Sequence, residues 1–198
     1  MPPATGFLVI TIILGYLLQM AFDPALIEAF ALWIDPTAPF DQIFSAPWQL
    51  VTYSFLHGGG LHLGLNLFAL WMFGSDVERV WGPRRFLVAY FAAVLTGAAA
   101  QILAVTLAGD GGGPMIGASA GIFGLLLCFG MLFPKRRIML LIPPIPMQAR
   151  TFVFVYAALE LVLGVTGTAE GVAHFAHLGG LVGGWLVYRY GASLSATR

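Results

Sequence analysis

The sequence predicts an all-α integral membrane protein: a bundle of six transmembrane helices with a long interfacial first loop. Hydrophobic residues make up 59% of the 198 residues, charged residues only 9%, and the mean hydropathy is +0.89. Soluble domains carry about 25% charged residues, so this composition excludes an ordinary soluble fold. Several apolar runs approach the ~20 residues that a helix needs to cross a bilayer. With no separate polar segment in the chain, we expect a single domain over residues 1–198.

Six windows of spanning length can be placed along the chain. The first lacks a basic flank and a small-residue cleavage site, so we expect a retained span and not a signal peptide. Cys128 is the single cysteine and falls in the fourth window, which excludes a disulfide framework. The windows cover residues 6–22, 61–79, 86–108, 117–134, 151–168 and 171–190.

The basic residues are distributed on one side of this predicted topology. All nine lysines and arginines lie at 79–85, 135–150 and 189–198, and with six spans these places face the same side. The positive-inside rule makes that side cytoplasmic, so both termini are expected there. Most acidic residues fall in the three opposite loops, namely Asp23, Glu28, Asp35, Asp41, Asp110 and Glu170.

Two connecting segments are apolar without being spans. The loop at 23–60 carries Trp33, Phe40, Phe44 and Trp48 among prolines and acids, a composition that favours the headgroup interface. The segment MLLIPPIPM at 139–147 is broken by prolines, which predicts an interfacial connector.

Few polar residues remain inside the predicted spans. Ionisable groups within a membrane indicate function by default, because burying them is costly. The alternative is that they only hydrogen-bond neighbouring helices. The set consists of His62, Asn66, Ser119, Glu160, His174 and His177.

Three of these residues are predicted to share one depth. Ser119 lies 16 residues from the basic residue that ends its span, His177 lies 12 and Asn66 lies 13. At ~1.5 Å per residue these separations correspond to about 24, 18 and 20 Å. All three therefore fall in one layer, between the midplane and the outer surface.

A serine and a histidine at one depth indicate a nucleophile and its general base. Imidazole can take the serine proton during attack and return it to the leaving group. The resulting oxyanion needs hydrogen-bond donors. His62 and Asn66 are four residues apart on one helix face, and both can donate.

Glycines surround both reactive residues. Gly117 and Gly121 flank Ser119, while Gly180 and Gly184 follow His177 in a G-x-x-x-G spacing. Such a spacing alone indicates ordinary helix packing. Together with Ser119 and His177, it predicts that the fourth and sixth spans pack closely.

Three motifs resemble those of the rhomboid intramembrane serine proteases, in their minimal six-helix bacterial form. They are HGGGLHLGLN at 57–66, GASAG at 117–121 and AHLGG at 176–180. The segment GSDVERVWG, which follows the second span, also resembles the acid-bearing inner loop of that family.

The resemblance implies peptide-bond hydrolysis in the membrane by a dyad without an acid, with Ser119 as nucleophile and His177 as base. It implies an oxyanion site formed by His62, Asn66 and the backbone N–H of Ser119, with His57 supporting the site from nearer its outer mouth. Substrates would be membrane-anchored proteins that enter from the lipid bilayer. No cofactor, metal or nucleic acid is expected, and the bacterial inner membrane is the implied location, with the active site opening outward. Oligomeric state stays open.

Some positions depart from the family pattern. Ala120 follows the serine where glycine is frequent, and Phe123 replaces a tyrosine that often packs against the catalytic histidine. The packing is expected to survive without the hydroxyl. Gln49 stands where an arginine is frequent in the first loop.

Two polar residues have no place in this scheme. His174 is predicted to lie in a loop or at the interface, nearer the outer surface than His177. Glu160 is predicted near mid-membrane, protonated and hydrogen-bonded, because no lysine or arginine shares its depth.

Other functions stay open. A metal- or haem-binding protein could use His57, His62, His174 and His177, although no H-E-x-x-H motif or carboxylate beside the histidines supports it. A transporter could use Glu160, but the expected repeats are not found. An inactive relative that binds transmembrane segments is disfavoured by the presence of both Ser119 and His177.

Overall fold

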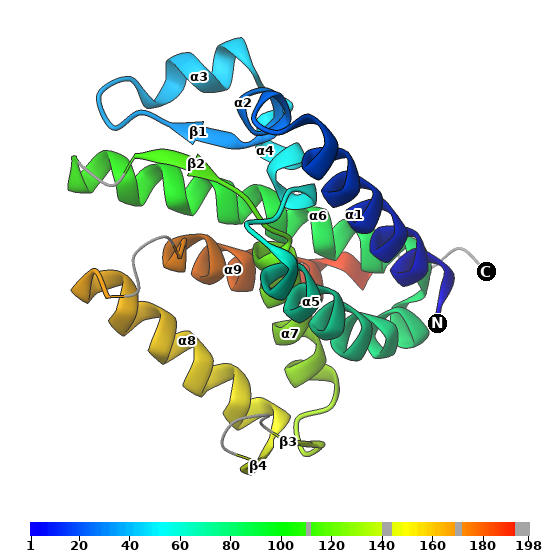
Figure 1. Cartoon of the computed structure of the whole chain (residues 1–198). Coiled ribbons are helices and arrows are strands. Elements are labelled where there is room, and N and C mark those ends of the chain that lie inside the picture. Colours follow the sequence, from blue (N-terminus) through cyan, green and yellow to red (C-terminus); the bar gives the residue numbers. More distant parts are fainter. Residues whose placement is uncertain (110–111, 140–143, 169–171, 193–198) are drawn as a thin grey trace.

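The computed structural model describes residues 1–109, 112–139, 144–168 and 172–192, and these form a mainly helical bundle (Figure 1). The helices are α1 (Pro3–Phe22), α2 (Ala25–Phe30), α3 (Pro39–Ser45), α4 (Gln49–Thr52), α5 (Gly60–Ala69), α6 (Ser75–Ala108), α7 (Ser119–Leu132), α8 (Ala149–Thr166) and α9 (His174–Tyr190). Two short turns of other helix types are η1 (Tyr53–Phe55) and η2 (Leu70–Gly74). The strands are β1 (Leu32–Ile34), β2 (Gly113–Met115), β3 (Arg137–Met139) and β4 (Pro146–Gln148).

Three helical stretches in the described residues are long and apolar enough to cross a membrane: Pro3–Phe22, Gly60–Ala108 and Ala149–Thr166. The second has 49 residues and would measure about 74 Å if straight, far more than one crossing requires. It breaks at Gly82, whose φ of 76° and ψ of 168° are not helical, and Pro83 follows. Glycine tolerates this φ and proline suits a new helix start, so the stretch contains both the second and third predicted spans.

The remaining two predicted spans correspond to α7 and α9, which have 14 and 17 residues. Both begin later than the apolar windows suggest, at Ser119 and His174. Gly117, predicted at the start of the fourth span, lies in the preceding loop with φ +126°. The six predicted windows thus all correspond to helices, and the prediction of a membrane helical bundle is confirmed.

The centre of the bundle is formed by α6, α7 and α9. A Cβ atom on Gly180 or Gly184 would collide with the backbone carbonyls of α7, at Ala120 and Gly124 respectively. A Cβ on Gly183 would lie 2.7 Å from the carbonyl oxygen of Ala92 on α6. Glycine pairs on α9 therefore allow backbone contact with both neighbouring helices.

The first loop is more structured than its composition suggests. It contains α2, β1, α3 and α4, and β1 pairs with β2 in an antiparallel ladder that places Leu32 opposite Met115. Figure 1 shows this ladder beside the end of α6. Phe40, Phe44 and Trp48 are exposed, at 61%, 81% and 50%, which suits the predicted interfacial position. The pairing joins the first loop to the segment that precedes α7.

Contacts at one end of the bundle join three predicted inner segments. Asp76 lies 2.6 Å from Arg79 and 2.6 Å from Arg136, which follows α7. Glu78 accepts hydrogen bonds from the backbone N–H groups of Ala4 and Thr5 in the first turn of α1. The start of α1, the start of α6 and the end of α7 therefore share one side.

The last helix ends on that side too. Arg85 donates to the carbonyl oxygens of Val187 and Tyr188 near the end of α9. The basic segments thus meet at one end of the molecule, as the span count requires. Of the predicted connector at 139–147, residues 140–143 lie outside the described residues, as do Asp110, Glu170 and Arg198.

Candidate active site

Ser119 and His177 meet where α7 crosses α9. Ser119 is the first residue of α7, and its Oγ lies 2.8 Å from Nε2 of His177. The two residues are 58 positions apart in the chain. The crossing is close because Gly180, three residues after His177, lies against the backbone of Ala120, the residue after Ser119. The glycines thus bring two short side chains within hydrogen-bond distance.

The imidazole of His177 is stacked on Phe123. Their ring centroids are 4.3 Å apart and the rings are inclined by only 2°. Phe123 lies one turn after Ser119 on α7, so Ser119 and the stacking ring come from the same helix. The packing expected at this position is confirmed, and it restricts the plane in which His177 can lie.

His62 and Ser119 both lie close to Gly117. A Cβ on Gly117 would lie 2.9 Å from Cε1 and 3.0 Å from Nε2 of His62, and 3.7 Å from Oγ of Ser119. Gly58 donates its backbone N–H to Nδ1 of His62 at 3.2 Å. Because Nδ1 accepts, the neutral ring carries its hydrogen on Nε2, the atom that faces Gly117. His62 is therefore a donor next to the serine.

Asn66 lies one turn further along α5. Its side chain is 7% exposed, and its amide nitrogen donates to the carbonyl oxygen of His62 at 3.0 Å. The structure thus places Asn66 in the same helix as His62 but directs its amide to the backbone and not to Ser119.

His57 is fully buried and precedes α5. Its ring centroid lies 5.0 Å from that of His62, and burial, together with the nearby His62, lowers the pKa of His57 to about 4. Its backbone is held by the side chain of Gln19, which accepts from the His57 N–H at 2.9 Å and donates to its carbonyl at 2.8 Å. His57 is therefore neutral near pH 7.

Gln19, a buried amide in an apolar helix, was detectable as a polar residue within a span but was missed.

Glu160 lies against two histidines. Its Oε2 is 2.6 Å from Nδ1 of His174 and 2.9 Å from Nδ1 of His177. His174 is the first residue of α9 and is only 6% exposed, so the prediction that it lies in a loop is wrong. The prediction that Glu160 is hydrogen-bonded is confirmed. The argument that no carboxylate lies beside the histidines is wrong. The sequence does not reveal that the side of α8 that carries Glu160 packs toward α9.

This cluster bears on the metal hypothesis. One ligand atom from each of Glu160, His174 and His177 lies within 4.8 Å of the others, and this is the candidate metal-binding group found among the described residues. Nitrogen and carboxylate ligands of this kind suit Zn²⁺. Among the described residues the four-histidine site is not assembled, because neither His57 nor His62 belongs to the group whose ligand atoms lie within 4.8 Å of one another.

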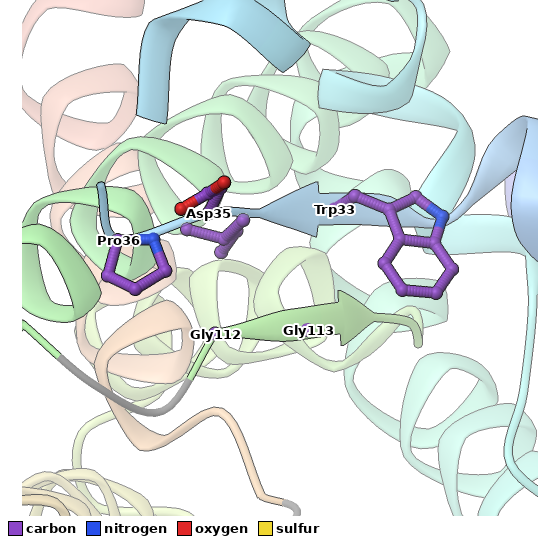
Figure 2. Close-up of a pocket in the computed structure, with 6 residues that line it drawn as sticks. Trp33, Asp35, Pro36, Gly112 and Gly113 are labelled. Carbon is purple, nitrogen blue, oxygen red and sulfur yellow. The ribbon is translucent and has the colours of Figure 1, made fainter. Parts of the chain in front are cut away.

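A surface hollow of about 510 Å³ lies elsewhere, beside β1 and β2 (Figure 2). Its lining includes Trp33, Asp35, Pro36, Gly112 and Gly113. The carboxylate of Asp35 accepts hydrogen bonds from Thr37, which lowers its pKa. Neither Ser119 nor His177 lines this hollow, so its size does not identify the reactive site.

The Rhomboid domain family matches residues 45–193, a range that includes every residue of this site except Gln19. The chain belongs to the rhomboid family. It is 34% identical over 138 residues to Rhomboid protease GluP of Bacillus subtilis, which covers 70% of this chain and 25% of that protein. It is also 34% identical over 99 residues to mitochondrial Rhomboid protein 1 of Saccharomyces cerevisiae, covering 50% and 29%.

A human protein, Rhomboid-related protein 3, is 36% identical over 85 residues, which cover 43% of this chain and 20% of that protein. The chain thus spans only about a fifth to a third of the length of these three rhomboid proteins. Family membership and the apolar helices together make this chain an integral membrane protein.

Proposed function

We propose that this rhomboid is an intramembrane serine endopeptidase that cleaves transmembrane segments of membrane-anchored proteins. Ser119 is the nucleophile and His177 the general base. The observation that carries the proposal is the 2.8 Å contact between Ser119 Oγ and His177 Nε2 within a rhomboid domain.

The reaction needs one proton shuttle. Oγ of Ser119 attacks the scissile carbonyl carbon while its proton passes to Nε2 of His177. The C–N bond then breaks, and the leaving amine takes that proton. Water attacks the acyl-enzyme, again giving a proton to Nε2, and the proton returns to Oγ as the acid product leaves. One water is consumed for each peptide bond cleaved.

We assign three hydrogen-bond donors to the proposed oxyanion site. The backbone N–H of Ser119 is in the first turn of α7, where helix N–H groups have no partner within the helix and the helix dipole favours negative charge. His62 offers Nε2–H, supported by the neutral His57. Asn66 would join after turning its amide away from the carbonyl of His62.

The proposed orientation follows from the two ends of the bundle. The basic residues share one end, while His174 begins α9 at the opposite end. We place the basic end and both termini in the cytoplasm of a bacterium, with the chain in the inner membrane and the active site opening outward. Because Ser119 is expected between the midplane and the outer surface, water could then reach it from outside.

A second candidate function is metal binding by Glu160, His174 and His177. It is favoured by the proximity of their ligand atoms. A metal on Nδ1 of His177 would leave Nε2 protonated and unable to act as a base, so the two functions make opposite predictions.

The deciding experiment is labelling of the detergent-purified protein with a fluorophosphonate, comparing the wild type with Ser119→Ala and His177→Ala. We expect label on the wild type alone, because attack needs both the hydroxyl and its base. Equal label on all three proteins, or none on any, would remove the proposed pair. Metal content of the same samples tests the second candidate.

A further inference from the structure

We propose that Glu160 is a positioning residue for this reaction, whose carboxylate accepts the Nδ1–H of His177 and keeps Nε2 directed at Ser119. The inference rests on the proposed serine chemistry and adds a third residue, from a third helix, to the expected dyad.

Glu160, His177 and Ser119 are in successive contact, and they come from α8, α9 and α7. Oε2 of Glu160 lies 2.9 Å from Nδ1 of His177, and Nε2 of the same ring lies 2.8 Å from Oγ of Ser119. Glu160 and His177 are 8% and 9% exposed. At this burial water cannot readily replace the carboxylate as a partner for the ring.

Hydrogen placement selects one tautomer of His177. To accept the proton of Ser119, Nε2 must carry a lone pair, so the neutral ring must carry its hydrogen on Nδ1. The opposite tautomer would direct the lone pair of Nδ1 at a carboxylate oxygen 2.9 Å away, which is repulsive. An ionised Glu160 therefore favours the reactive tautomer and stabilises the imidazolium that forms during attack.

The protons that His174 and Glu160 share determine the net charge of this pair. Its Nε2 lies 3.2 Å from the carbonyl oxygen of Thr168, which can only accept, so Nε2 carries a hydrogen. Its Nδ1 then needs one more proton in the 2.6 Å contact with Oε2. With that proton on His174, Glu160 stays ionised, the Glu160–His174 pair has no net charge, and Oε2 keeps a lone pair for His177. This arrangement reduces the cost of an acid within the membrane.

The contact with His177 is close but bent. At 2.9 Å it is within ion-pair distance, yet Nδ1 has no partner that meets hydrogen-bond angles. The proposed hydrogen bond requires the carboxylate to turn toward Nδ1 of His177, while His174 contacts the same oxygen at 2.6 Å. Gly164, one turn after Glu160, brings α8 close, because a Cβ there would lie only 3.1 Å from Cβ of His174.

The neighbouring ionisable groups are few in the part of the chain that is described. His174 contacts Glu160 directly, and His62 on α5 interacts electrostatically with His177. Phe123 covers one face of the His177 ring from α7. Glu160 is therefore the acceptor available to Nδ1.

The test compares phosphonylation rates of the wild type, Glu160→Gln, Glu160→Asp and Val153→Ala by the same fluorophosphonate. Val153→Ala loosens α8 where it packs on Gly130, without touching the cluster. At saturating probe we expect Glu160→Gln to react about 10²-fold more slowly, within the range of general-base effects. Glu160→Asp should recover part of that loss, the half-saturating probe concentration should stay unchanged, and Val153→Ala should react like the wild type.

A tautomer readout separates positioning from loss of structure. In ¹⁵N-histidine spectra, His177, assigned by its absence in His177→Ala, should carry its proton on Nδ1 in the wild type and lose this preference in Glu160→Gln. Wild-type rates and tautomer in Glu160→Gln would overturn the inference, as would an equal slowing by Val153→Ala. Zinc at one atom per chain that resists a chelator would also overturn it. Absence of label on the wild type would instead contradict the proposed function itself.

Discussion

Helix α9 meets its two neighbours at the site in different ways. Against α7 it presents glycines, so that Gly180 and Gly184 touch backbone carbonyls directly. Against α8 it presents side chains, since His174 and His177 reach Oε2 of Glu160. The distance between Ser119 and His177 is thus fixed by backbone contact, whereas the contact with Glu160 depends on rotatable bonds. The first interface determines whether the reactive pair exists, and the second adjusts it.

The largest expected effect comes from breaking the α7–α9 interface. Gly180→Val places a branched side chain against the carbonyl of Ala120, which cannot move without shifting α7. Overpacking of this kind costs about 1–3 kcal/mol or more, and the separated helices should lose fluorophosphonate labelling. Thermal unfolding and labelling check both effects.

The matched control is Gly64→Ala on α5, where no atom lies within 4 Å of the new Cβ. It should leave labelling intact and raise stability by about 0.5–1 kcal/mol. A Gly180→Val protein as stable and reactive as Gly64→Ala would show that the crossing is not limited by backbone contact.

The next effect concerns the pH dependence of stability that arises from the buried His57. The pKa of His57 falls from 6.5 to about 4 on folding, so the unfolded chain binds a proton in this range that the folded chain does not. Stability should therefore fall as pH decreases from about 6.5 toward 4, by up to about 3 kcal/mol. Replacing His57 with asparagine, which does not titrate, should flatten this part of the curve in urea unfolding. An unchanged slope in that variant would assign the acid sensitivity to other groups.

A smaller effect is expected from the ring that holds His177 in plane. Phe123→Ala removes the stacked contact, and such pairs contribute about 0.5–1.5 kcal/mol. Labelling should slow by roughly tenfold at most, the rate equivalent of that energy. Phe123→Tyr keeps the ring and should react like the wild type, so the comparison of the two variants isolates stacking.

The smallest effect should come from a slight change in the spacing between α8 and α9. A methyl group at Gly164 would lie 3.1 Å from Cβ of His174, a distance that a shift of a few tenths of an ångström relieves. Gly164→Ala should therefore slow labelling less than Phe123→Ala does, while leaving the melting temperature nearly unchanged. A loss as large as that of Gly180→Val would mean that both interfaces are equally rigid.

The sequence predicts the central interface better than the peripheral one for a physical reason. Ser119, His177 and the glycines lie at fixed spacings within α7 and α9, and their depth can be counted from the basic residues that end each helix. Glu160 can also be placed on its helix, but periodicity does not say which neighbour a polar residue of a nearly all-apolar helix faces. Its contact with His177 is a property of the assembled bundle.

Two other features differ in whether a local sequence pattern could predict them. The pairing of β1 with β2 joins segments about 80 residues apart, and neither short strand shows an alternating pattern. The reversal at Gly82 occurs in a polar stretch, where glycine followed by proline does mark the boundary between spans. The strand pairing depends on tertiary contacts, which a local pattern does not reveal. The break at Gly82, in contrast, is indicated by the local signal of glycine followed by proline.

If the chain is the protease proposed above, the β1–β2 ladder has a consequence for where a substrate is cut. The strand that pairs with the first loop ends at Met115, four residues before Ser119, and the N–H of Gly117 donates to the carbonyl oxygen of Tyr53 at 3.0 Å. The segment that leads into Ser119 is therefore joined to the aromatic loop by backbone hydrogen bonds. With that loop at the outer headgroups, as in the proposed orientation, the depth of Ser119 would be set relative to the outer surface of the bilayer. We then expect a thicker or thinner membrane to be accommodated at the inner ends of the helices, with the depth of cleavage unchanged.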